Sequence, residues 1–186
     1  MRFNLPTTLT LLRIVLIPVL VLFCYLPVDW SNIACVVIFS IAALTDWLDG
    51  YLARRWQQMT AFGAFLDPVA DKLMVAVALV LIVQNDPSPS LAIASAVIIG
   101  REITITSLRE WMAELGERAK IKVSWLGKVK TTFQMLAIVV LLYGSDYENI
   151  PLRDIGYLLL FVAAVLTLWS MISYLRAALP LLKRGL

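Results

Sequence analysis

Six long apolar segments dominate this chain and leave it few possible folds. Short polar, charged or turn-forming stretches separate them. Of the 186 residues, 61% are hydrophobic, and apolar runs so long and so numerous exceed what one water-soluble core of this length would contain. We therefore predict an all-α integral membrane protein, a bundle of six transmembrane helices that forms one domain over residues 1–186.

The spans follow from the apolar runs and the turns between them. Residues 1–10 are expected to form a short interfacial segment that leads into the first span. A cleaved signal peptide is rejected because Arg13 interrupts the apolar run and no small-residue cleavage site follows. Pro18 and Pro68 are expected to bend the first and third spans without ending them. The predicted spans are 11–26, 33–52, 62–83, 91–112, 125–143 and 155–179.

The basic residues predict the orientation of the bundle. Six spans place both termini on one side of the membrane. On the opposite side only one turn holds a basic residue, Arg153, whereas the other Lys and Arg residues lie at the termini, in the connectors 54–60 and 114–122, or in the adjoining helix halves. Cytoplasmic segments carry this excess of basic residues. Both termini are therefore predicted to be cytoplasmic.

Four aspartates lie on two predicted helical faces at the cytoplasmic side. If 40–55 is helical, the first face holds Asp46, Asp49, Gly50, Ala53 and Arg54. The second face, in the third span, holds Gly63, Asp67 and Asp71, which repeat every four residues. The two faces can converge because the third span begins where the second ends.

Carboxylates beside apolar runs need compensation, since each ionised one costs roughly 3 kcal/mol to insert. A divalent cation would supply it. The sequence contains no histidine, so the ligands would be oxygen atoms, which favours Mg²⁺ or Mn²⁺. Two alternatives remain open. The acidic residues could line the pathway of a small cation transporter, and the small residues could serve only helix packing.

The spacing Asp-x2-Asp-Gly-x2-Ala-Arg-x8-Gly-x3-Asp-x3-Asp resembles the signature of the CDP-alcohol phosphatidyltransferases, and this chain matches every fixed position from Asp46 to Asp71. The opening from Asn4 to Arg13 is similar to the branch of that family whose acceptor is glycerol 3-phosphate. Gly127-Lys128-Val-Lys130-Thr131 in the fifth span also fits that branch. The resemblance extends over essentially the whole chain.

The resemblance implies roles for the signature residues. Asp46, Asp49 and Asp67 would be metal ligands, and Asp71 would both lie near the metal and take the proton of the acceptor. Gly50, Ala53 and Gly63 would leave room for the nucleotide of the CDP-lipid, and Arg54 would contact its phosphate or ribose.

The resemblance also implies the reaction, which is phosphatidyl transfer from CDP-diacylglycerol to sn-glycerol 3-phosphate with release of CMP. Another acceptor, such as inositol phosphate, serine or phosphatidylglycerol, is the nearest alternative. A multi-pass protein of the bacterial inner membrane is implied, with a cytoplasmic active site, contacts to membrane lipids and a homodimeric state. No nucleic-acid partner is expected.

Basic residues form a second group of candidates. Glycerol 3-phosphate is a dianion, so its pocket needs fixed positive charge. Arg101 and Arg109, eight residues apart on one helical face, are candidates together with Lys128 and Lys130. The alternative is that these residues only anchor cytoplasmic helix ends, with Glu102 as a structural partner of Arg101.

The predicted orientation can be tested with reporters. A reporter fused after Leu186 should be cytoplasmic, and one inserted between Pro87 and Pro89 should lie on the far side of the membrane. An insertion in the connector 115–122 serves as a second cytoplasmic reference. Finding the 87–89 and C-terminal reporters on the same side would contradict the six-span topology.

Overall fold

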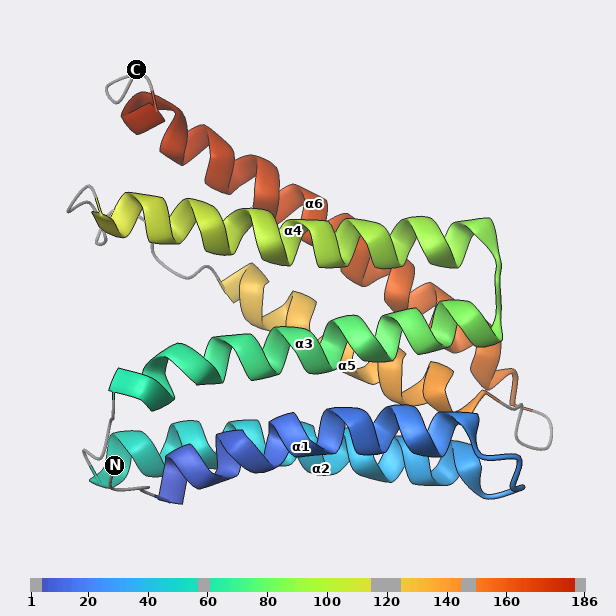
Figure 1. Ribbon diagram of the computed structural model, residues 1–186. Coiled ribbons are helices and arrows are strands. Elements are labelled where there is room, and N and C mark those ends of the chain that lie inside the picture. The colour runs from blue at the N-terminus through green and yellow to red at the C-terminus, as the bar shows by residue number, and fades with distance from the viewer. Residues whose placement is uncertain (1–4, 57–60, 115–124, 145–149, 183–186) are drawn as a thin grey trace. The chain divides into compact units, whose positions relative to one another are not determined.

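The computed structural model describes residues 5–56, 61–114, 125–144 and 150–182. Six α-helices make up nearly all of this part of the chain (Figure 1). The predicted all-α architecture with six helices is thereby confirmed. The helices are α1 (Leu5–Tyr25), α2 (Ser31–Trp56), α3 (Ala61–Asn85), α4 (Pro89–Glu114), α5 (Trp125–Tyr143) and α6 (Leu152–Leu182).

Each helix contains the core of one predicted span, and most extend beyond it by a few residues. The helix α1 already begins at Leu5, so much of the predicted interfacial segment forms its first turns. Pro6 is tolerated there because a first-turn residue has no intrahelical partner for its N–H. Pro18 and Pro68 lie inside α1 and α3, and neither ends its helix. The turn after α5 uses Gly144 at a φ of 71°, a conformation that favours glycine.

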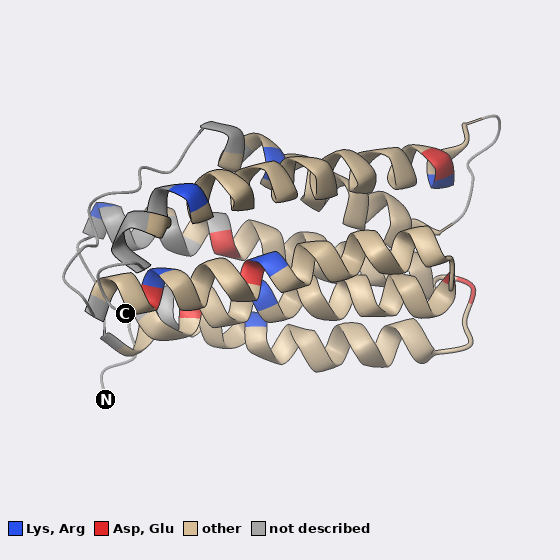
Figure 2. Ribbon diagram, turned by 90° about the horizontal axis from the view of Figure 1, so that it is seen from above, with Lys and Arg blue, Asp and Glu red and all other residues tan. Residues whose placement is uncertain are grey.

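Three helices are long and apolar enough to cross a membrane, through Thr8–Tyr25, Pro89–Ala113 and Leu152–Arg176. Shorter apolar helical stretches occupy Ser31–Asp46 and Val129–Tyr143. Most of the length of the ribbons carries no charged residue (Figure 2). Large apolar side chains such as Phe65 and Trp169 are exposed, as lipid-facing residues are. The chain is therefore a membrane protein, whereas the crossing of all six helices and their orientation stay predictions.

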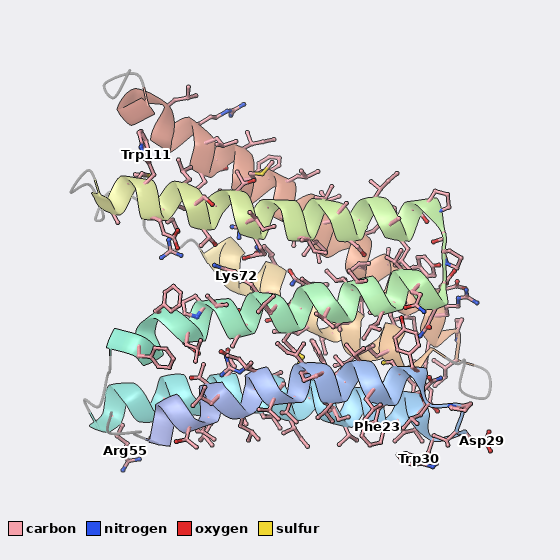
Figure 3. The ribbon with its side chains drawn as sticks, in the orientation of Figure 1. Phe23, Asp29, Trp30, Arg55, Lys72 and Trp111 are labelled. Atoms are coloured by element: carbon pink, nitrogen blue, oxygen red, sulfur yellow. The ribbon has the colours of Figure 1, made fainter. Side chains whose placement is uncertain are left out.

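The residues fall into two compact units. The first comprises residues 1–86 and 138–153, and in it α1, α2 and α3 pack against one another (Figure 1). At one end of this unit the Phe23 and Trp30 rings lie 5.6 Å apart, at the turn between α1 and α2, and Arg55 lies at the opposite end of α2 (Figure 3). The packing places α1 against both helices that carry the acidic signature.

The second unit comprises residues 87–137 and 154–186. Its core contains apolar side chains from α4, α5 and α6, among them Ile98, Ala137 and Leu160. It also buries polar side chains, namely Ser95, Lys130, Gln134 and Thr167. Polar groups inside a membrane protein are rare and are often functional, so these residues form a second candidate for a functional cluster.

Candidate active site

One arginine contacts two aspartates of the signature. The Nη1 atom of Arg13 lies 2.8 Å from Asp46 Oδ1 and 3.2 Å from Asp67 Oδ1. Because both distances are measured to the same nitrogen, these two carboxylates of α2 and α3 are close enough to share one cation. The predicted convergence of the two acidic faces is confirmed for this pair.

Helix periodicity explains why Arg13 reaches this position. Thr10, Arg13 and Leu20 are all buried and lie on one face of α1, the face that packs against α2 and α3. The Arg13 side chain is only 1% exposed. A buried guanidinium needs an opposite charge nearby, and the aspartates supply it.

Arg13 was missed as a site residue by the sequence reasoning. In the sequence, Arg13 stands out only as a charge that argues against a signal peptide and as the last residue of the opening that resembles the family. One feature of the sequence could have identified it: a charge inside an apolar span is costly unless an opposite charge lies nearby. The sequence does not name that partner, because Asp67 lies 54 residues further along the chain and no periodic pattern joins the two.

Only some of the other residues of the acidic signature have described side chains. Asp71 lies one turn beyond Asp67 on α3, and both Asp71 and Gly63 are partly buried. The side chains of Asp49, Gly50, Ala53 and Arg54 lie outside the described residues. Among the side chains that are described, no group of three from Asp, Glu, Cys or His lies close enough to hold a metal. The complete ligand set therefore stays a prediction.

The residues present nevertheless fit an oxygen-ligated divalent cation. The Arg13 guanidinium contacts one oxygen of Asp46 and one of Asp67, so the two carboxylates lie close enough together to bind one cation. Carboxylate oxygens are the donors that Mg²⁺ and Mn²⁺ prefer. Both aspartates remain accessible, with side chains 38% and 43% exposed.

A second charged cluster lies in the other unit and is centred on Glu102. Its Oε1 lies 2.8 Å from Arg101 Nη1 and 2.6 Å from Lys130 Nζ. Arg101 also donates a hydrogen bond from Nη2 to Ser170 Oγ at 3.2 Å. The Lys130 side chain is only 2% exposed, so this cluster joins α4, α5 and α6 through buried charge.

The structure thus brings two of the four candidate acceptor residues together. Arg101 and Lys130 meet through Glu102, whose predicted role as a partner of Arg101 is confirmed. Arg109 is exposed on α4, and the side chain of Lys128 lies outside the described residues. Whether these four bind the acceptor stays a prediction. Nearby on the same helices, Arg101 Nε, Gln134 Oε1 and Thr167 Oγ1 are buried without a hydrogen bond in the structure.

Comparison with known proteins decides the family. Residues 3–169 match the family model for CDP-alcohol phosphatidyltransferase. The chain belongs to this family. The resemblance drawn from the acidic signature is confirmed, and the matched region includes both charged clusters.

Individual relatives in this family are similar over nearly their whole length. The chain is 58% identical over 178 residues to a protein of Escherichia coli (strain K12) and to one of Shigella flexneri serotype 5b (strain 8401). In each comparison the match covers 96% of both chains. Both relatives are named CDP-diacylglycerol–glycerol-3-phosphate 3-phosphatidyltransferase.

The Glu102 cluster generates a stability prediction. Glu102→Gln removes the charge that compensates buried Lys130, so the free energy of unfolding should fall by about 3 kcal/mol. Adding Lys130→Met to Glu102→Gln should restore part of this loss, because the uncompensated cation is then gone. Unfolding of the full chain in mixed detergent micelles measures both effects.

An exposed ion pair provides the matched control. Arg153 contacts Asp86 and its side chain is 53% exposed. Arg153→Gln should therefore lower the free energy of unfolding by less than about 1 kcal/mol. Equal losses in the Glu102 and Arg153 variants would contradict a buried structural role for Glu102.

Proposed function

We propose that this chain transfers the phosphatidyl group of CDP-diacylglycerol to sn-glycerol 3-phosphate, giving phosphatidylglycerophosphate and CMP. The observation that carries the proposal is that Asp46 and Asp67, two aspartates of the family signature, both contact the Arg13 guanidinium. The names of the two relatives, each 58% identical, support the choice of donor and acceptor.

The acidic residues would assist attack at phosphorus. The acceptor hydroxyl forms a bond to the lipid-side phosphorus of the diphosphate, the bond to the CMP oxygen breaks, and the hydroxyl proton leaves. Asp46, Asp49 and Asp67, with Asp71 nearby, would hold Mg²⁺ or Mn²⁺. Such an ion, when bound, neutralises negative charge that grows on the phosphate oxygens. The chain contains no histidine, so Asp71 is the proposed base for the hydroxyl proton.

The remaining signature residues would bind the donor. Gly50, Ala53 and Gly63, which have little or no side chain, would let the nucleotide of the CDP-lipid approach the helix backbone. Arg54 would contact the phosphate or ribose of the nucleotide, since a guanidinium has a planar set of donors that suits either group. Membrane lipids surround the apolar helices, which keeps the diacylglycerol part of the donor in the bilayer.

Basic residues would select the acceptor. Arg101, Arg109, Lys128 and Lys130 are the proposed ligands of the glycerol 3-phosphate phosphate group. Glu102 contacts Arg101 and Lys130 and so fixes two of these cations on α4 and α5 before any acceptor arrives. Two cations around one anion leave an excess of one positive charge, which favours a bound anion.

The setting of the reaction is proposed from the family and from the pattern of basic residues. It is the bacterial inner membrane, with both termini and the active site on the cytoplasmic side and the protein acting as a homodimer. The cytoplasmic side is where the basic residues of the connectors would lie.

A purified preparation in detergent micelles tests the proposed reaction. With CDP-diacylglycerol and Mg²⁺ or Mn²⁺, CMP should be released when sn-glycerol 3-phosphate is added, and chelation of the metal should stop the release. Serine, inositol phosphate and phosphatidylglycerol serve as comparison acceptors. If any of these three releases CMP faster than sn-glycerol 3-phosphate does, the chain belongs to another branch of the family. Absence of CMP with all four acceptors would refute the enzyme assignment.

Replacing Asp71 should affect the reaction differently from replacing the other aspartates. A strongly bound metal lowers the basicity of its carboxylate ligands, so the base must be the most weakly coordinated of the four. Asp71→Asn should therefore retain metal-dependent binding of CDP-diacylglycerol while losing transfer, whereas Asp46→Asn should lose both.

Equilibrium binding of CDP-diacylglycerol to each variant, with and without Mn²⁺, separates these roles. Loss of metal-dependent binding in Asp71→Asn would make that residue primarily a ligand. The base would then have to be sought elsewhere, including the phosphate group of the acceptor.

A further inference from the structure

We propose that Arg13 is a positioning residue that holds Asp46 and Asp67 together in the metal-free protein and competes with the divalent cation for them. The inference rests on the proposed function, because it takes these two aspartates as metal ligands. It adds a residue of α1 to a site otherwise built from α2 and α3.

The geometry of the contact supports this role. A single nitrogen of Arg13 contacts Oδ1 of both aspartates, at 2.8 and 3.2 Å. The arginine side chain is 1% exposed, whereas the two aspartate side chains are 38% and 43% exposed. The guanidinium thus contacts the carboxylates from the protein interior, and their exposed parts are the side from which a cation in solution can approach.

Electrostatics gives the contact two opposite effects. Two carboxylates this close repel each other, and the guanidinium offsets that repulsion, which keeps both side chains in place. The same positive charge repels a divalent cation that binds the same oxygens. Arg13 should therefore weaken metal binding while the donor is absent. When the donor is bound, its negative diphosphate offsets the repulsion between Arg13 and the metal. Metal and donor should therefore bind cooperatively.

A purely structural role for Arg13 predicts the opposite result. If the arginine only anchored α1 to its neighbours, its removal would let Asp46 and Asp67 move apart, and the metal would bind more weakly. The two roles therefore differ in the direction of one measurable change, the affinity for metal in the absence of the donor.

The experiment compares Arg13→Gln with the unmodified full-length protein in detergent micelles. Free Mn²⁺ is followed by electron paramagnetic resonance during a titration without CDP-diacylglycerol. Because a unit charge within a few ångströms of the metal is removed, the Kd for Mn²⁺ should fall about tenfold. Arg55→Gln is the matched control, since Arg55 is exposed on α2 and contacts Tyr51, and its Kd should equal that of the unmodified protein.

Thermal unfolding provides a second measurement on the same samples. Without metal, Arg13→Gln should unfold at a lower temperature than the unmodified protein, because the two carboxylates then repel each other. Saturating Mn²⁺ should raise the Tm of Arg13→Gln by more than it raises that of the unmodified protein, since the metal replaces the missing cation. An equal or smaller rise would contradict the proposal.

An unchanged or higher Kd for Mn²⁺ in Arg13→Gln would overturn the proposal. If that variant is not recovered folded, Arg13→Met replaces it, because methionine also removes the charge and its unbranched apolar side chain can fill the buried position. Its Kd for Mn²⁺ should likewise fall about tenfold, and no fall would overturn the proposal. Asp67→Asn distinguishes a failure of the proposed metal site from a failure of the proposed role of Arg13. If the unmodified protein and Asp67→Asn bind Mn²⁺ equally, the metal assignment itself fails, whatever Arg13 does.

Discussion

The contact of one guanidinium with two carboxylates is the interaction on which the first unit of this protein depends. Ionised groups beside apolar helices are tolerated only when opposite charges meet them. Arg13 on α1 contacts Asp46 on α2 and Asp67 on α3, so one side chain fixes the positions of these three helices relative to one another. Apolar packing alone could not fix them so well in a bilayer, because lipid chains compete for the same apolar surfaces.

The two charged clusters have opposite compositions. In the first unit one cation lies between two anions, and in the second unit Glu102 lies between two cations, Arg101 and Lys130. The contacts therefore leave an excess of one negative charge in the first cluster and one positive charge in the second. The first excess favours a cation and the second favours an anion, in agreement with the proposed metal site and the proposed acceptor phosphate site.

The helices could be predicted well from the sequence because their boundaries depend on local features. The fifth predicted span coincides with α5, since an apolar run between Trp125 and Tyr143 is bounded on both sides by polar residues. The meeting of Asp46 and Asp67 was also predictable, because a short connector joins two helices whose acidic faces follow from a period of 3.6 residues. The partners of Arg13 and Lys130 were not predictable. Lys130 lies 28 residues from Glu102, and such pairs depend on how distant helices pack.

The place of Arg13 also has a consequence for biogenesis. The chain is synthesised from its N-terminus, so α1 leaves the ribosome before either of its acidic partners exists. Its arginine lies 54 residues before Asp67, and until α2 emerges the charge has no counterion in the protein. In isolation α1 therefore has a charged side chain facing lipid, which opposes its release into the bilayer. The contacts with Asp46 and Asp67 remove that cost once α2 and α3 have been made, so the later helices stabilise the earlier one in the membrane.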